Sequence, residues 1–384
     1  MIKIANKADC VGCTACESVC PTGAIKLRTD AEGFYYPVTA TEKCIVCGLC
    51  DKTCPVAQVW ETEEQPKAYA VIAKEENILE ESSSGGVFFC LAKEVINRGG
   101  IVYGAALTED IKVAHIGIEN PQDILRIMGS KYVQSDLSGI FAEIKANLKA
   151  GRMVLFAGTP CQVAGLQLYL GSNRERLITV TLICHGVPSP KVFDKYICSL
   201  ENKYGKKVCD VKFRSKKVSW RRYSFVAKFD DGFELTEEFV NNTYLKGFIN
   251  NLFLRPSCHR CRFKTVNHKS DITLGDFWGI GNVAPTIDSE KGVSLCCVNS
   301  KKGAEIFEAI LDHVKSEEVA FAQAVKYNSA YAESALQNRM RKWFFEHLDK
   351  TPVEKNIEKS LSPSLVIRLV LKLKRRKYRA ESWN

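Results

Sequence analysis

From about residue 68 onward, short apolar segments alternate with longer amphipathic segments. Segments rich in Val, Ile and aromatic residues predict strands at 68–73, 101–107, 153–158, 177–184 and 271–277. Apolar residues at helical spacing predict helices at 85–98, 137–150, 160–170, 190–204 and 303–314. Residues 207–239 predict a strand meander that turns at Asp230-Asp231-Gly232. The pattern indicates a chain of mixed α and β class.

The first sixty residues lack this alternation and carry two runs of cysteines instead. Both runs read C-x2-C-x2-C-x3-C-P, which is the signature of a bacterial ferredoxin with two 4Fe–4S clusters. In such runs the fourth cysteine binds the other cluster. We therefore predict one cluster on Cys10, Cys13, Cys16 and Cys54, and a second on Cys44, Cys47, Cys50 and Cys20. Structural zinc is the alternative, although a zinc site does not require three evenly spaced cysteines and a distant fourth.

These patterns predict a fold of α+β class and divide the chain into three regions. Residues 1–60 are predicted to form a ferredoxin-like domain with two 4Fe–4S clusters. A polar, acidic stretch at 56–67 reads as a linker. Residues 61–350 are predicted to form a mixed α/β domain, and residues 351–384 a basic amphipathic tail.

Composition and charge narrow the functional classes. The formal net charge is +10, but nine Lys and Arg against three Glu place +6 of it in residues 351–384. The remaining +4 does not indicate nucleic-acid binding. The first residues contain no apolar run typical of a signal peptide, so a cytoplasmic protein is expected. In that compartment, the seventeen cysteines are expected to bind metals rather than to form disulfides.

Four further cysteines lie where strands are predicted to end or turn, namely Cys161, Cys184, Cys258 and Cys261. Four thiolates are the ligand count of one more 4Fe–4S cluster. A zinc site, a redox disulfide and unrelated buried thiols stay open as alternatives. Cys161 follows Pro160 at a predicted helix start, where the helix dipole is expected to lower its pKa. Packing roles are expected for Cys90, Cys198, Cys296 and Cys297, while Cys209 receives no assignment.

A serine-glycine turn at residues 82–86 precedes a predicted helix. Such a turn exposes N–H donors to a phosphate, but Ser and Gly also form ordinary helix caps.

Taken together, these motifs resemble the coenzyme F-420 hydrogenase/dehydrogenase beta-subunit family. The resemblance rests on the two cysteine runs followed in order by SSSGGVF (82–88), GSKYVQSDL (129–137), GTPCQVAGL (158–166), ICHGVPSP (183–190), CHRCRF (258–263) and GDFWG (275–279). It covers residues 1 to about 280.

The resemblance implies an FAD-binding domain with a 4Fe–4S cluster near the flavin. Relatives reduce a deazaflavin coenzyme, and others reduce chlorophyll-type substrates with electrons from ferredoxin. By motif, the third cluster would use Cys161, Cys184, Cys258 and Cys261. The FAD would contact Ser82, Ser83, Ser84, Gly85, Gly86, Val87, Phe88, Ser130, Lys131, Tyr132, Val133, Gln134, Ser135, Gly158 and Thr159.

These assignments indicate an iron–sulfur flavoprotein oxidoreductase that works on an organic substrate or a deazaflavin. A flavin can take single electrons and deliver a hydride, which clusters cannot. No G-x-G-x-x-G follows a strand, so the expected electron source is ferredoxin or a partner subunit. His185, beside Cys184, and Asp276 could each serve a proton or a structural hydrogen bond, so no catalytic residue is assigned. The rival interpretations are a non-catalytic electron-transfer subunit and a cluster-based sensor.

The basic tail allows two interpretations. Its apolar stretch at 365–373 and basic stretch at 374–379 suit peripheral contact with an anionic membrane, or a terminal helix packed on the body.

Overall fold

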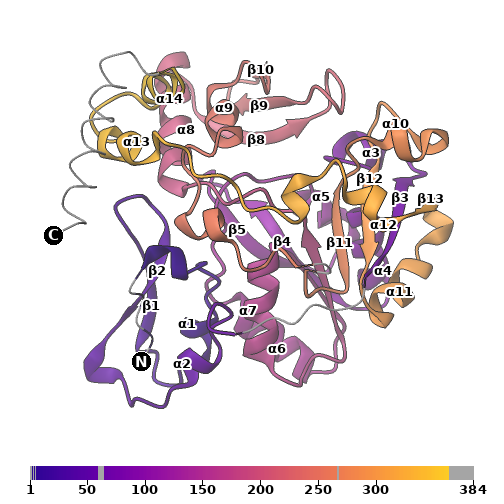
Figure 1. Cartoon of the computed structure of the whole chain (residues 1–384), viewed down its shortest axis with the longest axis horizontal. Helices are drawn as coiled ribbons and strands as arrows, with labels where there is room; N and C mark the ends of the chain where they lie inside the picture. Colours follow the sequence, from indigo (N-terminus) through magenta and orange to yellow (C-terminus); the bar gives the residue numbers. More distant parts are fainter. Residues whose placement is uncertain (1, 3, 5, 59–64, 266–267, 363–384) are drawn as a thin grey trace, which may run out of the picture.

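The computed structural model describes residues 2, 4, 6–58, 65–265 and 268–362. Figure 1 shows three parts: an N-terminal unit, a large central sheet with helices on both faces, and a smaller sheet with its own helices. No helix in these described ranges is both long enough and apolar enough to cross a bilayer.

The central sheet has eight strands in the order β13-β3-β12-β11-β7-β6-β4-β5. Along the chain these are β3 (Lys67–Ala73), β4 (Ile101–Leu107), β5 (Val113–Ile118), β6 (Val154–Gly158), β7 (Leu177–Leu182), β11 (Ile272–Asp276), β12 (Ser294–Val298) and β13 (Val314–Val319). Strands β4, β6, β7 and β11 are parallel neighbours. Strand β3 runs the same way, because it is antiparallel to β12, which is antiparallel to β11. These five strands therefore end at one edge, called here the carboxyl edge.

Alternating side chains of the sheet form two separate cores. On β6, Leu155 and Ala157 face the core shared with the helix that follows β3, whereas Val154 and Phe156 face the opposite core. The first face is covered by α4 (Val87–Asn97), α5 (Ile124–Ile127) and α11 (Lys301–Glu308), and the second by α6 (Ile140–Lys149) and α7 (Pro160–Leu170). Burial on both faces explains why the parallel strands read as continuous apolar runs.

The smaller sheet lies beside the central one and has an aromatic core. Its strands are β8 (Val208–Ser215), β9 (Ser224–Phe229) and β10 (Glu234–Glu238), which confirms the predicted meander. Four helices share this core: α8 (Pro190–Tyr204), α9 (Thr243–Ile249), α13 (Arg341–His347) and α14 (Val353–Leu361). Three short helices, α3 (Glu76–Glu81), α10 (Ile280–Val283) and α12 (Phe321–Val325), lie near β3 and β13.

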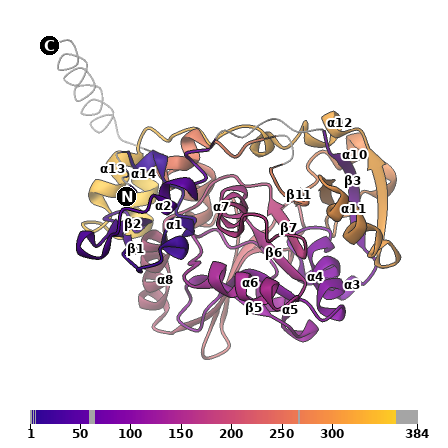
Figure 2. The ribbon, with the colours of Figure 1, turned by 90° about the horizontal axis from the view of Figure 1, so that it is seen from below.

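The N-terminal unit is a hairpin with two short helices. The hairpin pairs β1 (Ile25–Thr29) with β2 (Tyr35–Thr39), and the helices are α1 (Ala15–Val19) and α2 (Leu49–Lys52). Helix α1 packs against α7, and the turn η1 (Lys7–Asp9) packs against η4 (Pro256–Arg260). Figure 2 shows this unit next to α13 and α14. The N-terminal unit is therefore attached to the body through α7, η4 and α13.

Most predicted elements are present, and two differ. The helix predicted at 303–314 ends at Glu308, because the chain turns at Leu311–His313 and continues as edge strand β13. The helix was predicted too long because apolar residues continue at helical spacing across this turn, at Ile306, Ile310 and Val314. Of the predicted tail, α14 packs into the body, while its apolar and basic stretches lie outside the described residues.

Candidate functional site

The two cysteine runs adopt the same backbone shape. The second residue of the first C-x2-C spacer has a positive φ in both runs, at Gly12 (+69°) and Val46 (+53°). The next spacer repeats this at its first residue, at Thr14 (+66°) and Gly48 (+73°). Left-handed residues are costly unless they are glycine. Their recurrence at matching positions indicates that each run is bent to wrap the same kind of group.

The structure brings the predicted ligands of the first cluster together across the two runs. Cys10, Cys13 and Cys16 are buried, and Cys54 from the second run is partly buried beside them. Burial, together with the adjacent Cys10 and Cys54 thiols, raises the pKa of Cys16 to about 12. Burial and the nearby Cys10 thiol also raise the pKa of Cys54. Thiols from both runs thus lie within electrostatic range of one another, and the crossed ligand assignment stays a prediction.

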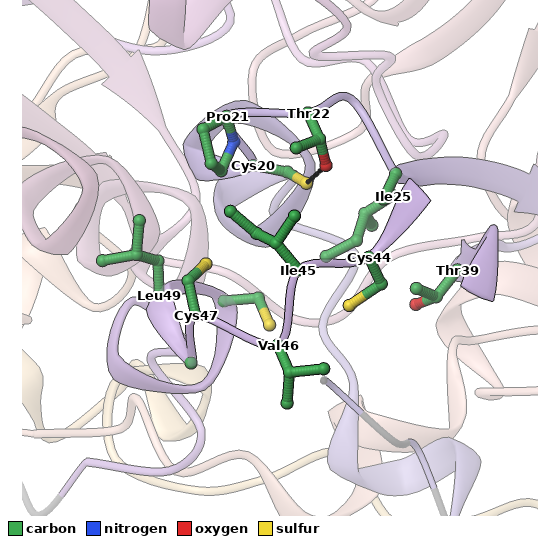
Figure 3. Close-up of a pocket in the computed structure, with 13 residues that line it drawn as sticks. Cys20, Pro21, Thr22, Ile25, Thr39, Cys44, Ile45, Val46, Cys47 and Leu49 are labelled. Atoms are coloured by element: carbon green, nitrogen blue, oxygen red, sulfur yellow. Dashed lines mark hydrogen bonds between the residues drawn. The ribbon is translucent and has the colours of Figure 1, made fainter. Parts of the chain in front are cut away.

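The predicted ligands of the second cluster line one pocket. Cys20, Cys44, Cys47 and Cys50 lie around it with the side chains of Ile45 and Leu49, as Figure 3 shows for all but Cys50. This site is open to solvent: Cys47 is exposed, and Val46 is 73% exposed. A cluster here would lie at the surface of the protein, whereas the first would lie against the body.

Four of the nine cysteines outside the runs lie near one another at the carboxyl edge. Cys161 lies in the first turn of α7, Cys184 follows β7, and Cys258 and Cys261 lie in and after η4. Burial raises the pKa of Cys161, and the thiols of Cys261, Cys184 and Cys258 raise it further. The expected lowering of the Cys161 pKa by the helix dipole is therefore wrong, because desolvation of the thiolate outweighs it.

Hydrogen bonds fix the surroundings of this third set. The Val187 N–H donates to the Cys258 sulfur at 3.3 Å, and the Thr159 hydroxyl lies 3.2 Å from the Cys161 sulfur. The ammonium of Lys264 donates to the Cys184 carbonyl. Within the described ranges, no three Cys, His, Asp or Glu side chains are placed to hold a metal ion.

Helix α7 joins the first and third cysteine sets. It carries Cys161 at its start, and the Cys161 thiol is close enough to Cys13 to affect the pKa of Cys13. One turn later, Gly165 leaves room for the first run: a Cβ there would lie 2.8 Å from the Cys13 sulfur.

The segments predicted for FAD meet at the carboxyl edge. Ser130 donates to the Ser83 hydroxyl oxygen from its backbone N–H (2.9 Å), and its own hydroxyl lies 3.2 Å from that oxygen. The ring nitrogens of His115 lie 2.7 Å from the Ser135 hydroxyl and 3.0 Å from the Ala157 carbonyl, next to Gly158 and Thr159. Residues from two of the motifs are thus linked directly, and His115 links the second of them to Ala157, the residue before the third motif.

Some of the predicted FAD residues have structural partners instead. The Ser82 hydroxyl donates to Ile78 and the Ser84 hydroxyl to Val293, both at backbone carbonyls. Gly85 is required by packing, because a Cβ would lie 2.3 Å from the Val71 carbonyl oxygen. Among the other members of the set, Val87, Phe88, Tyr132 and Val133 pack in cores, and Lys131 donates to the Met128 and Arg126 carbonyls. Gly86 is the N-cap residue of α4.

Gln134, another residue predicted to contact FAD, bonds to the N-terminal unit and to Arg255. Its side-chain oxygen accepts from the Tyr35 N–H at 3.3 Å and from Arg255 at 3.3 Å. It therefore bridges the N-terminal unit and the body. A contact of Gln134 with FAD stays a prediction.

Sequence reasoning missed a buried arginine beside the flavin motifs. Arg214 pairs with Asp276 and lies over the rings of Tyr223 (4.4 Å) and Trp278 (5.5 Å). Its Nε and Nη2 are buried and have no hydrogen-bond partner among the described residues. In the sequence, only Asp276 could have indicated such an arginine, because a buried carboxylate requires a cation. His185, by contrast, is occupied within its turn, where its Nε2 bonds the side-chain oxygen of Asn251.

Lys216 holds the serine-glycine turn in place. Its ammonium donates to the Leu79 carbonyl (2.7 Å), the Ser84 carbonyl (2.6 Å) and the Lys291 carbonyl. Burial lowers the pKa of Lys216 to about 8. The residues on either side of the turn are therefore anchored before any ligand binds.

Comparison with protein families identifies two matches. Residues 151–323 match the family described as the C terminus of the coenzyme F420 hydrogenase/dehydrogenase beta subunit. Residues 9–58 match the 4Fe-4S dicluster domain. The second match covers both cysteine runs, and the first contains Cys161, Cys184, Cys258 and Cys261.

Two individual proteins are also similar to this chain. The F subunit of the F(420)H(2) dehydrogenase of Methanosarcina mazei is 24% identical over 185 residues, which is 46% of this chain and 53% of that protein. The chain thus matches about half the length of this curated relative. A chain in a xenon-derivatised F420-reducing [NiFe] hydrogenase complex from Methanosarcina barkeri is 18% identical, with a TM-score of 0.46, over 79% of this chain and 94% of that one.

Proposed function

Because the chain belongs to the coenzyme F420 hydrogenase/dehydrogenase beta-subunit family, we propose that it passes electrons between three 4Fe–4S clusters and an FAD. The FAD would reduce or oxidise a deazaflavin coenzyme or a related organic substrate. The observation that carries the proposal is the series of three cysteine sets, which runs from the exposed second run, through the buried first run, to the carboxyl edge.

The cysteine sets fit 4Fe–4S clusters. Two of them combine thiolates from both runs, as the ferredoxin signature requires. The left-handed residues in each run turn the backbone around the group it would hold. The third set brings four thiols from separate elements into electrostatic range, and its desolvated thiols would lose their protons on binding iron.

The carboxyl edge fits an anionic, aromatic cofactor such as FAD. Open α/β sheets bind ligands outside the carboxyl ends of their strands. Two buried N–H-bearing nitrogens of Arg214 have no partner within the described chain, and a buried donor without an acceptor is unfavourable. Gly86 at the start of α4 leaves the first-turn N–H groups without a side-chain cap, which suits a phosphate.

Bound FAD would supply the step from single electrons to a hydride. The chain would hold it between two groups of residues: Ser83 and Ser130 on one side, Arg214 with Trp278 on the other. Asp276 would keep the Arg214 guanidinium oriented, helped by the Trp220 indole N–H, which donates to Asp276 at 2.9 Å. Lys216 would keep the serine-glycine turn from moving.

A second candidate is an electron-transfer subunit that does no substrate chemistry itself. It is favoured by the curated relative, which is named as one subunit of a dehydrogenase rather than as a whole enzyme. In this case ferredoxin or a partner subunit would exchange electrons with the clusters, and the substrate would bind elsewhere.

The test is a measurement of iron, sulfide and extracted flavin per chain on protein purified without oxygen. About twelve irons and one FAD are expected, four irons for each of three clusters. About eight irons with no flavin after reconstitution would contradict the flavoprotein proposal. Oxidation or reduction of a deazaflavin by the isolated chain would then separate the enzyme from the non-catalytic subunit.

A further inference from the structure

Arg255 is a fully buried cation that joins the first cysteine run to the body. It precedes η4, three residues before Cys258, and is 1% exposed. Its Nε donates to the Cys10 carbonyl at 2.8 Å, and its Nη2 donates to the Tyr35 carbonyl at 2.9 Å. The same Nη2 lies 3.5 Å from the Cys10 sulfur. One guanidinium therefore contacts both the backbone and the thiol of a predicted cluster ligand.

The surroundings of Arg255 contain no carboxylate partner among the described residues. Its acceptors are carbonyls, the Gln134 amide oxygen and the Cys10 sulfur, and its guanidinium lies 4.3 Å from the ring centre of Tyr36. A buried charge without a counter-charge is strongly destabilising. A 4Fe–4S cluster with four thiolates carries a net negative charge, so it would supply the missing counter-charge at Cys10.

We propose that Arg255 is a positioning residue that raises the reduction potential of the cluster on Cys10, Cys13, Cys16 and Cys54. This inference rests on the proposed function, since it requires clusters in both runs. Reduction adds one negative charge to a cluster, and a nearby cation with an N–H···S bond favours that state. The first cluster would therefore draw electrons from the second.

The other cysteine sets lack an equivalent contact among the described residues. Around the second set, the lining of the pocket is Cys, Pro, Thr, Gly and aliphatic side chains, with solvent at its opening. At the third set, the Lys264 ammonium donates to the Cys184 carbonyl rather than to a sulfur. The Arg255 charge lowers the pKa of Cys258 electrostatically, without a hydrogen bond to its sulfur in the described structure. The effect of Arg255 should accordingly be largest at the first cluster, smaller at the third and absent at the second.

Arg341 offers a matched control. It is also buried at the junction with the N-terminal unit, where it donates to the Leu254 carbonyl (2.9 Å) and to both carboxylate oxygens of Glu32. No hydrogen bond joins it to a cysteine in the described structure. Loss of Arg341 would weaken the junction without removing a charge from a cluster ligand.

The experiment is an anaerobic redox titration of the cluster-loaded protein followed by EPR. The signal absent from Cys47→Ser is assigned to the second run. In Arg255→Gln, the reduced-to-oxidised ratio of the first cluster at a fixed potential should fall about tenfold, which is about 59 mV for a one-electron couple. Arg255→Lys should give a smaller fall, and Arg341→Gln should leave the ratio unchanged.

An unchanged first-cluster potential in Arg255→Gln, or an equal shift in Arg341→Gln, would overturn the proposal. If the Arg255 variants do not retain the first cluster, the order of reduction in the unmodified protein becomes the test. The proposal requires that the first cluster become reduced before the second as the potential is lowered. The reverse order overturns the inference about Arg255 and leaves the three-cluster proposal intact. Unmodified protein with fewer than two clusters would instead refute the proposed function itself.

Discussion

The two cysteine runs have the same backbone shape but different surroundings. In the first run, Gly12 sits against the body, where a Cβ would lie 2.5 Å from the Gln134 side-chain nitrogen and 3.0 Å from Arg255. At the matching position of the second run, Val46 points into solvent. The spacing of the cysteines is thus a local property that binds a cluster. What each cluster does depends on what packs around its run.

Under the proposed function, this difference would give the two clusters separate roles in one electron path. The second run presents Ile45 and Val46, 63% and 73% exposed, next to its pocket, where a redox partner could approach closely. The first run contacts α7, Gln134 and Arg255, which all belong to the body. The same sequence motif therefore occurs once facing solvent and once packed against the body, where the third cysteine set lies.

The largest expected contrast is between Cys13→Ser and Cys47→Ser. Each should lose about four irons. Cys13 is buried against α7, so its loss should reduce the free energy of unfolding by about 3 kcal/mol more than the loss of exposed Cys47. Anaerobic denaturant unfolding with iron analysis measures both quantities, and equal destabilisation would show that the first run is not embedded.

A smaller contrast is expected between Gly12→Ala and Gly48→Ala. Their φ angles are similar, +69° and +73°, so both substitutions cost about 1 kcal/mol of backbone strain. Only Gly12→Ala also forces a Cβ into Gln134 and Arg255, which should cost a further 1–3 kcal/mol or so. Because nothing lies within 4 Å of the Gly48 position, Gly48→Ala serves as the control for strain alone. Indistinguishable unfolding curves for the two variants would argue against the packing of the first run.

The smallest effect is expected for Val46→Gly. A β-branched residue at φ +53° is strained, and glycine relieves this at the expense of a more flexible unfolded chain. The free energy of unfolding should rise by less than about 1 kcal/mol. Iron content should stay unchanged, and a loss of iron would mean that Val46 supports the cluster rather than facing solvent.

The sequence predicted those features that depend on neighbouring residues. Cysteine spacing reports local loop geometry, and apolar runs report buried strands, so the crossed cysteine sets and the parallel strands were accessible. The convergence of Cys161, Cys184, Cys258 and Cys261 required the family resemblance, because these residues come from three separate elements.

The side chains that distinguish the two runs could not be predicted in this way. Arg255 lies 245 residues from Cys10 in the chain, and Arg214 lies 62 residues from Asp276. Neither arginine stands in a motif, and each acquires a role only when the chain folds. Gly165 does stand in a motif, but its role in making room for Cys13 likewise appears only in the folded chain.

The most direct test of an outer and an inner ferredoxin cluster measures how deeply each one is buried. EPR power saturation of the reduced protein, with and without a water-soluble dysprosium chelate, reports the distance of each cluster from solvent. We predict that the chelate strongly relaxes the signal missing in Cys47→Ser and barely affects the signal missing in Cys13→Ser. Equal relaxation of both signals, or stronger relaxation of the first-run cluster, would contradict this assignment.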